Sequence, residues 1–220
     1  MSSGNTGEQG VRPVYLIEDD ETVLRACAQA LKLADLEVRT FGSAEKALVA
    51  FDEDPPAAVV SDVRLPGMSG LELLDVVWQR DCDVPVILIT GHGDVSMAVQ
   101  AMRAHAYDFI EKPFSDQRLL DVIAAAIRES RRRLHAVQRQ QQAGTRLAHL
   151  SQRELEVARK VALGLPNKVV ARELAISEKT VQAHRRNVMD KAGVSSAAEL
   201  TRMLMIADPG FAAEPEASKS

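Results

Sequence analysis

The sequence predicts an α/β domain with a doubly wound, parallel, five-stranded sheet, followed by a small all-α domain. Two observations predict this division. Short β-branched or apolar runs alternate with helical patterns in the first half, whereas the second half shows only helical patterns. Residues 12–127 include 20 acids and 10 bases, whereas residues 128–206 include 7 acids and 16 bases. An acidic half joined to a basic half indicates two domains with different partners, and the basic half suits a polyanion such as nucleic acid.

Composition excludes several classes of protein. Apolar residues make up 46% of the 220 residues and charged residues 26%, which is typical of a globular protein rather than a disordered one. The apolar runs are far shorter than the roughly 18 residues of a membrane span, and the polar N-terminus lacks the layout of a secretory signal. With only Cys27 and Cys82, we expect neither a disulfide framework nor a zinc site. We therefore expect a cytoplasmic protein without a membrane partner.

Five runs in the first half are typical of buried strands. Between them, segments such as 22–33 and 70–80 carry apolar residues three and four apart, as amphipathic helices do. The five candidate strands cover residues 14–17, 37–41, 57–61, 86–90 and 107–110. Strands and helices that alternate in this way predict a parallel sheet with helices on both faces, and such sheets bind ligands at the carboxyl ends of their strands.

Polar side chains follow four of the five candidate strands. In chain order they are Glu18, Asp19 and Asp20, then Asp62, then Thr90, and finally Lys112. Crowded carboxylates need a cation, and hard oxygen ligands favour Mg²⁺. A lysine and a hydroxyl suit phosphoryl oxygens, and an aspartate can act as the nucleophile. Each residue alone is more often a helix cap, a turn former or a surface charge, but their joint placement at one edge indicates a phosphoryl site.

Residues 14–127 resemble the receiver domain of two-component response regulators, which has a flavodoxin-like fold. The resemblance rests on the motifs LIEDDETV, VVSDVRLPGMSG, VILITGHGDVSMAVQAM and AYDFIEKPF. It implies a phosphoacceptor at Asp62 and an acidic pair, Glu18 and Asp19, that organises Mg²⁺ together with the backbone carbonyl of Arg64. Because Glu18, Asp19 and Asp20 follow the strand one after another, the register of the pair is open. We place it at Glu18 and Asp19 because Val23 then falls at the usual apolar helix position.

The same resemblance implies how the phosphoryl group is sensed. Thr90 and Lys112 would contact its oxygens, and Phe109 would be the aromatic switch that moves with Thr90. A cis peptide is expected between Lys112 and Pro113. His105 stands where many receivers have glycine, which is a departure from the pattern.

Residues 128–146 are polar and favour a helix, which predicts a helical linker. Two interpretations remain open. The segment is either a solvated extension of the last receiver helix, or Leu134 and Val137 form part of a dimer seam. We expect a break in the chain at residues 143–145 and disordered tails at 1–11 and 208–220.

Cap residues divide the basic half into short helices. Ser151 with Glu154 predicts a capping box at the start of the first helix. Asn167 is expected to cap the second helix and Ser177 the third, which covers residues 178–191. Two short helices, a turn and a basic helix are the layout of a helix-turn-helix.

Residues 147–207 resemble a LuxR-type DNA-binding domain of four helices. The matching stretches are LSQRELEVARKVALGLPNK and ARELAISEKTVQAHRRNVMDKAGV. On the third helix a shared face of Lys179, Gln182, Ala183 and Arg186 could enter the major groove. The resemblance implies that the last three of these face bases. It gives phosphate contact or support of the helix to Lys168, Thr180, His184, Arg185 and Lys191.

A receiver joined to this domain is the architecture of FixJ/NarL-type transcription regulators, and the TGHGDVSMAVQAM stretch favours the FixJ side. The resemblance implies a response regulator rather than an enzyme, with four partners: a sensor histidine kinase, double-stranded promoter DNA, a second copy after phosphorylation, and RNA polymerase. Two alternatives remain. One is a phosphorylation-independent DNA binder with a degenerate receiver. The other is a haloacid-dehalogenase-like phosphatase. The motif of that family is D-x-D-x-T, and this sequence comes close to it with Glu18-x-Asp20-x-Thr22.

Overall fold

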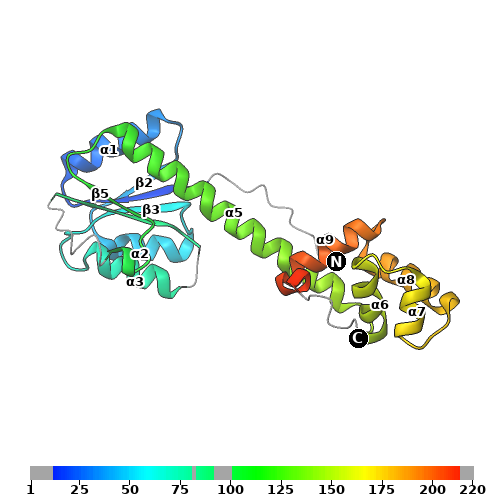
Figure 1. The fold of residues 1–220 in the computed structure, drawn as a ribbon. Helices are drawn as coiled ribbons and strands as arrows, with labels where there is room; N and C mark the ends of the chain where they lie inside the picture. The colour runs from blue at the N-terminus through cyan, green and yellow to red at the C-terminus, as the bar shows by residue number, and fades with distance from the viewer. Residues whose placement is uncertain (1–11, 81–82, 92–100, 214–220) are drawn as a thin grey trace, which may run out of the picture. The chain divides into compact units, whose positions relative to one another are not determined.

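The structure is a computed structural model that describes residues 12–80, 83–91 and 101–213. The chain divides into two compact units, Met1–Arg133 and Leu134–Ser220, and the division lies within the predicted linker. In the N-terminal unit five strands form one parallel sheet in the order β2-β1-β3-β4-β5 (Figure 1). The strands are β1 (Val14–Ile17), β2 (Val38–Phe41), β3 (Ala58–Asp62), β4 (Val86–Thr90) and β5 (Asp108–Glu111). The predicted parallel five-stranded sheet is confirmed.

Helices cover both faces of this sheet. Alternate residues of a strand point to opposite faces, so each face has an apolar core of its own. The labelled helices of the unit are α1 (Glu21–Leu33), α2 (Ala44–Glu53), α3 (Gly70–Gln79) and the beginning of α5 (Asp116–Ala148). Tyr15 and Ile17 pack in a cluster with α2 and α3. Val14 and Leu16 pack in a second cluster with α1 and α5. Two cores on opposite faces are the doubly wound arrangement that the sequence predicts.

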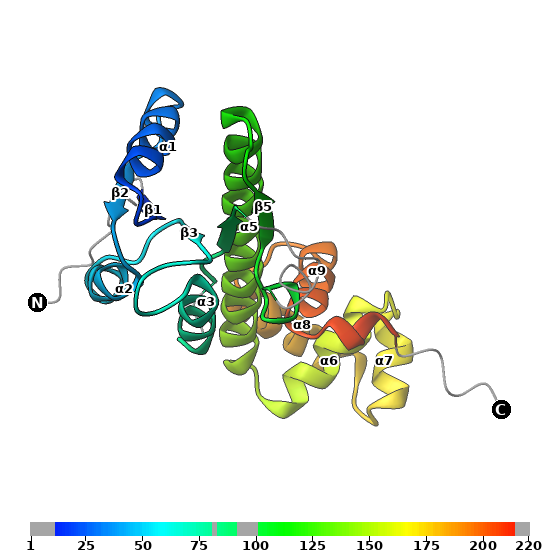
Figure 2. The same cartoon turned by 90° about the vertical axis from the view of Figure 1, so that its left-hand side faces the viewer.

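The three inner strands are buried throughout, whereas the edge strands β2 and β5 are only partly buried. Figure 2 shows the sheet running from β2 at one edge to β5 at the other. A parallel strand covered on both faces needs an uninterrupted apolar run, which is why the sequence indicates the inner strands clearly. The third strand nevertheless ends one residue later than expected, so that Asp62 is its last residue.

The expected break at residues 143–145 is wrong, because α5 is continuous from Asp116 to Ala148. Within the C-terminal unit, the buried Ala143 packs with Ala192 and Met203. Glycine is only about 1 kcal/mol less favourable than alanine inside a helix. The packing of Ala143 therefore keeps α5 continuous through Gly144. The segment after Ile127 is therefore a helical continuation of α5, and both interpretations of Leu134 and Val137 stay predictions.

The C-terminal unit is all-α, as predicted. Its helices are α6 (Gln152–Ala162), α7 (Asn167–Glu173), α8 (Glu178–Ala192) and α9 (Ala197–Ala207), and a short 3-10 helix, η1 (Pro209–Ala213), follows. They pack around one apolar core (Figure 2). The predicted tail 208–220 starts too early, because Phe211 is 3% exposed and belongs to this core. The expected tail 1–11 and residues 214–220 lie outside the described residues.

The helix caps of this unit are partly as predicted. Ser151 and Glu154 form a complete capping box, and Ser177 accepts a hydrogen bond from the amide of Thr180. The expectation for Asn167 is wrong: Pro166 is the N-cap residue of α7 and Asn167 begins the helix. No helix in the described ranges is long and apolar enough to cross a membrane.

Candidate functional site

The carboxyl ends of four strands bring the predicted phosphoryl-site residues to one edge of the sheet. The parallel register aligns the ends of β1, β3, β4 and β5. Asp62 and Thr90 are the last residues of β3 and β4, while Glu18 follows β1 and Lys112 follows β5. The amide of Lys112 donates a hydrogen bond to the carbonyl of Thr90 at 2.7 Å, which fixes the chain where Lys112 leaves the sheet. The peptide between Lys112 and Pro113 is cis, as expected.

Two carboxylates share the ammonium group of Lys112. Its Nζ lies 2.6 Å from Oε2 of Glu18 and 2.5 Å from Oδ2 of Asp62. Both carboxylates are buried, at 5% and 7% exposed, although they are 94 and 50 residues from Lys112 in sequence. Buried carboxylates are stable only when a cation or hydrogen bonds compensate their charge, and here one ammonium group serves two of them.

The electrostatics of the cluster follow from this arrangement. Burial raises the pKa of Glu18, the neighbouring Asp62 raises it further, and the hydrogen bond from Lys112 only partly opposes them. Burial alone would lower the pKa of Lys112. The hydrogen bonds to Asp62 and Glu18 outweigh that effect, so the pKa of Lys112 lies above its usual value. The ammonium group is therefore held in its charged form between two acids.

The three consecutive acids after β1 have separate environments. Asp20 is the N-cap of α1, where its Oδ1 accepts hydrogen bonds from the amides of Thr22 and Val23. Glu18 points into the ion cluster, and Asp19 is exposed. A helix cap is the usual role of an acid at this place, and it leaves Glu18 and Asp19 as the remaining members of the predicted pair.

The structure brings together Glu18 and Asp62 but does not assemble the whole predicted metal set. Among the described residues, no three His, Cys, Asp or Glu side chains lie close enough to hold a metal ion. Arg64 meets Asp62 through its backbone amide, which donates to Oδ1 at 2.7 Å. The donor set still has the chemistry that Mg²⁺ prefers, because this ion commonly takes only one or two carboxylates and completes its shell with water and phosphate oxygens.

Sequence reasoning missed Gly70, which sets how closely α3 approaches Asp62. A Cβ atom at Gly70 would lie 2.2 Å from the backbone oxygen of Asp62 and 3.0 Å from Cα of Val63. The amide of Gly70 donates to the carbonyl of Val63 at 3.0 Å, and Oε1 of Glu45 accepts from the amide of Met68 at 2.8 Å. The loop between Asp62 and α3 is thus fixed from both sides. Its two glycines within PGMSG were the available signal.

The predicted switch residues lie on neighbouring strands. Thr90 is fully buried at the end of β4. Phe109 is partly buried in the middle of β5 and packs against the cluster shared with α2 and α3. β4 and β5 are adjacent in the sheet, where Thr90 lies opposite Glu111 and Phe109 opposite Leu88.

The predicted recognition helix is α8, and its two sides differ sharply. Val181 and Val188 are buried in the core of the C-terminal unit, at 0% and 1% exposed. The face that the sequence assigned to base contact is open to solvent, because each of its four members is exposed: Lys179, Gln182, Ala183 and Arg186. A helix buried on one side and polar on the other presents side chains in the way that groove binding requires.

The other predicted DNA-contact residues divide between supporting contacts and an exposed position. Arg185 is half-buried and donates to Oδ1 of Asn167 at 3.0 Å, which ties α8 to α7. Lys191 lies 2.7 Å from the buried carboxylate of Glu154 and so ties α8 to α6. Lys168 is exposed at the start of α7.

Thr180 and His184 are half-buried on α8. The hydroxyl of Thr180 lies 2.8 Å from that of Ser177, the residue that caps the helix. This pair fixes the first turn of α8, next to Lys179 on the exposed face.

Two family models match the chain, one on each unit. The response regulator receiver domain matches residues 14–124. The luxR family of bacterial regulatory proteins matches residues 148–204.

The chain is also similar to curated proteins along most of its length. Nodulation protein W of Bradyrhizobium diazoefficiens is 40% identical over 200 residues, which cover 91% of this chain and 88% of that protein. The transcriptional regulatory protein FixJ of Rhizobium meliloti is 42% identical over 193 residues, which cover 87% of this chain and 94% of that protein.

Solved structures agree with these relatives. The response regulator StyR is 36% identical with a TM-score of 0.72, and the match covers 88% of this chain and 98% of that one. Full-length FixJ from B. japonicum is 39% identical with a TM-score of 0.59, over 89% of this chain and 97% of that one. In the motif of the phosphatase alternative, Asp20 is the N-cap residue of α1. The chain therefore belongs to the FixJ-like response regulators, transcription regulators that join a receiver domain to a LuxR-type DNA-binding domain.

Proposed function

We propose that this response regulator is switched by transfer of a phosphoryl group to Asp62. The observation that carries the proposal is the buried Asp62 carboxylate, held 2.5 Å from Nζ of Lys112 at the carboxyl edge of the sheet. The amide of Arg64 holds its other oxygen. A carboxylate whose orientation is fixed beside a cation is a suitable nucleophile for phosphoryl transfer.

In the proposed reaction, an oxygen of Asp62 attacks the phosphorus of a phosphohistidine on a sensor histidine kinase. The new O–P bond forms as the P–N bond breaks, and the leaving histidine nitrogen keeps the electron pair and takes up a proton. Lys112 offsets the charge of the phosphoryl oxygens, and the hydroxyl of Thr90 donates a hydrogen bond to one of them. Attack of water on the acyl phosphate later releases inorganic phosphate and restores Asp62.

The residues of the cluster also fit Mg²⁺. Glu18, Asp19, Asp62 and the backbone carbonyl of Arg64 would hold it. When bound, the ion supplies positive charge that offsets the crowded oxygens. The fit is supported by the charge balance, because Glu18 and Asp62 share only one ammonium group and burial raises the pKa of Glu18.

We further propose how the switch reaches DNA. The phosphoryl group draws Thr90 towards it, Phe109 follows, and the surface around β5 changes. Two chains then pair, and each places the exposed face of α8 in a major groove of promoter DNA. Gln182, Ala183 and Arg186 would face bases, with Lys179 beside them and Lys168 at the phosphates. The protein would act in the cytoplasm with RNA polymerase as a further partner.

The phosphoacceptor is tested by intact mass after incubation with acetyl phosphate and Mg²⁺. We expect wild type to gain the mass of one phosphoryl group and Asp62→Asn to gain none. Asp75→Asn is the matched control, because Asp75 is an exposed carboxylate on α3 outside the cluster, and it should be modified like wild type. Equal modification of Asp62→Asn would refute Asp62 as the acceptor. A wild type that gains no mass would favour the degenerate-receiver alternative.

The DNA interface is tested by comparing Arg186→Ala with Lys168→Ala at one salt concentration. Loss of a base contact should weaken binding to the specific site by roughly 1–3 kcal/mol and relax its specificity, whereas loss of a phosphate contact should weaken all sequences alike. Gel-shift titrations on specific and scrambled duplexes measure both effects. Unchanged specificity in Arg186→Ala would remove this residue from base recognition.

A further inference from the structure

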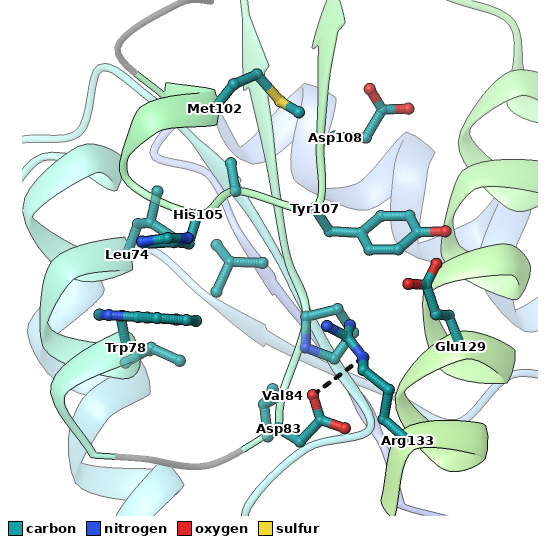
Figure 3. A pocket seen from close by; sticks show the side chains of 14 residues that line it. Leu74, Trp78, Asp83, Val84, Met102, His105, Tyr107, Asp108, Glu129 and Arg133 are labelled. Atoms are coloured by element: carbon teal, nitrogen blue, oxygen red, sulfur yellow. Dashed lines mark ion pairs between the residues drawn. The ribbon is translucent and has the colours of Figure 1, made fainter. Parts of the chain in front are cut away.

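The N-terminal unit has a cleft that the proposed phosphoryl transfer does not use. Its volume is about 630 Å³, and it lies between the end of α3, the starts of β4 and β5, and the middle of α5 (Figure 3). Ligand pockets typically have volumes of about 300–1,000 Å³. Asp62 and Lys112 lie at the carboxyl ends of the strands, whereas Pro85 and Tyr107 of the cleft immediately precede the amino ends of β4 and β5. The cleft is therefore separate from the phosphoryl site.

One wall of the cleft presents stacked aromatic rings. Trp78 at the end of α3 and His105 lie with ring centroids 4.0 Å apart and planes 11° apart (Figure 3). Trp78 is 58% exposed, and the nearby Met102 is 53% exposed. A tryptophan that stays in water gives up the favourable burial of a large ring, and such residues are enriched where a ligand or partner covers them.

His105 reaches this position through an unusual backbone conformation. Its φ is +68°, a value that favours glycine and that costs other residues about 1 kcal/mol. Histidine tolerates this region better than most residues, and the amide of His105 closes the turn by donating to the carbonyl of Met102. The sequence therefore carries an imidazole ring where glycine is the ordinary choice, and this ring stacks on a face of Trp78.

The opposite wall is polar and acidic. Figure 3 shows the carboxylate of Glu129 on α5 facing the hydroxyl of Tyr107, across the cleft from the stacked rings. Arg133 pairs with Asp83 at 3.5 Å, and Asp108 pairs with Arg118, which does not line the cleft. In the described part of the chain no ion pair involves Glu129. Its carboxylate is the acceptor that remains for a cation from outside.

We propose that this cleft binds a small molecule with a planar aromatic ring and a cationic amino or amidino group. The ring would pack against Trp78 and His105, and the cationic group would meet the carboxylate of Glu129. A charged ammonium near an aromatic surface and a carboxylate gains both a cation–π interaction and a charge-assisted hydrogen bond. Such a ligand would contact β5 and α5, so the receiver unit would have a second input besides phosphorylation.

The ligand class can be tested directly because Trp78 is the only tryptophan of the chain. Full-length protein is titrated with 2-phenylethylammonium, neutral 2-phenylethanol and anionic 3-phenylpropionate while tryptophan fluorescence is followed. We expect saturable binding with the cation favoured about tenfold over the alcohol, the ratio typical of one charge-assisted contact worth about 1.4 kcal/mol, and with the anion weakest. An absent response, or equal affinity for all three probes, would overturn the proposal.

Two variants separate the charge from the aromatic surface. Glu129→Gln should abolish the preference for the cation. Asp121→Asn should keep it, because this variant also replaces a carboxylate of α5 by its amide, but outside the cleft. His105→Gly should weaken the binding of all three probes without changing their order, because it removes ring surface. Glycine adopts the positive φ of this position without strain, so the fold should be kept. A cation preference that survives Glu129→Gln would contradict the assigned role of this residue. Asp62→Asn should bind the probes with wild-type affinity, because Asp62 lies outside the cleft. The result of this titration therefore does not depend on whether Asp62 is the phosphoacceptor.

Discussion

Single side chains decide whether the carboxyl edge of the sheet can hold and exchange a phosphoryl group. Asp62 and Glu18 are buried acids that share the ammonium group of Lys112. Without a cation, two buried acids beside each other raise the free energy of the folded state. We therefore propose two roles for Lys112 that can be measured separately, stabilisation of the fold and contact with the phosphoryl group.

Lys112→Met should lower the free energy of unfolding by roughly 1–3 kcal/mol in the absence of divalent ions, since it leaves two buried acids without their cation. Mg²⁺ should restore more stability to this variant than to wild type, because the ion then supplies the missing charge. Thermal unfolding with and without Mg²⁺ measures both effects. Lys46→Met is the control, since Lys46 is exposed on α2. If Lys112→Met unfolded at the wild-type temperature, the ammonium group would not hold the cluster together.

Gly70→Ala should disturb the phosphoacceptor without removing any charge. The added Cβ would lie 2.2 Å from the backbone oxygen of Asp62, so the start of α3 or the end of β3 must move. We expect a loss of roughly 1–3 kcal/mol in unfolding free energy and slower modification by acetyl phosphate. Urea unfolding and the time course of intact mass measure the two effects. Wild-type values for both would show that the loop adapts freely.

The side chains that meet at the carboxyl edge of the sheet could be predicted from sequence, but their pairing could not. A strand end followed by an acid, a threonine or a lysine is visible in the sequence, and parallel strands align these ends. The contact of Lys112 with Glu18 joins residues 94 apart, and no local pattern indicates which of three consecutive acids it meets. The close approach of Gly70 to Asp62 is likewise a property of the packed chain.

At the scale of elements, burial and capping explain which helices the sequence indicates correctly. The capping box at Ser151 and Glu154 is a local signal and is confirmed. Asn167 has the residue type of a cap, but Pro166 takes that position and Asn167 binds Arg185 instead. Phe211 and Gly144 were misjudged because each depends on partners distant in sequence, the core of the C-terminal unit and the packing of Ala143.

Glu154 makes the stability of the C-terminal unit depend on pH. The hydrogen bond from Lys191, and then that from the amide of Ser151, lower the pKa of Glu154 to about 2, well below the ordinary value of 4.5. The folded state thus favours the carboxylate, so this stabilisation is present above pH 4.5 and is lost as the pH falls towards 2. Glu154→Gln should unfold more easily than wild type at pH 7, with a difference that shrinks steadily below pH 4.5.

Thermal unfolding followed by circular dichroism at several pH values tests this prediction. Glu156→Gln serves as the control, since Glu156 lies on the same helix and is only partly buried in its pair with Arg153. A difference between wild type and Glu154→Gln that stayed constant down to pH 2 would mean that Glu154 does not titrate with folding.

Gly144→Ala tests the continuity of α5. Gly144 lies inside the helix, and an added Cβ there would have no neighbour within 4 Å. Alanine should therefore stabilise the helix by about 0.5–1 kcal/mol, because it restricts the unfolded chain without a clash. Circular dichroism during thermal unfolding measures the change. A break in the chain at this position would instead make the substitution neutral or destabilising.

At the scale of the whole molecule, the chain consists of an acidic unit and a basic unit with different sites. The acidic unit carries the ion cluster, and the basic unit carries the exposed face of α8. The charge asymmetry, together with the change from alternating strands and helices to helices alone, predicted this division. Composition could not predict the cleft beside α3 and α5, because the stacked rings of Trp78 and His105 on its wall are far apart in sequence.

The central claim is that phosphorylation of Asp62 controls DNA binding, and one comparison tests it directly. The affinity of wild type and of Asp62→Asn for promoter DNA is measured with Mg²⁺ before and after addition of acetyl phosphate, at one salt concentration because salt alone changes affinity by orders of magnitude. We predict that wild type gains about tenfold or more and that Asp62→Asn gains nothing. An equal gain in both proteins, or no gain in a wild type shown to carry the phosphoryl group, would contradict the claim.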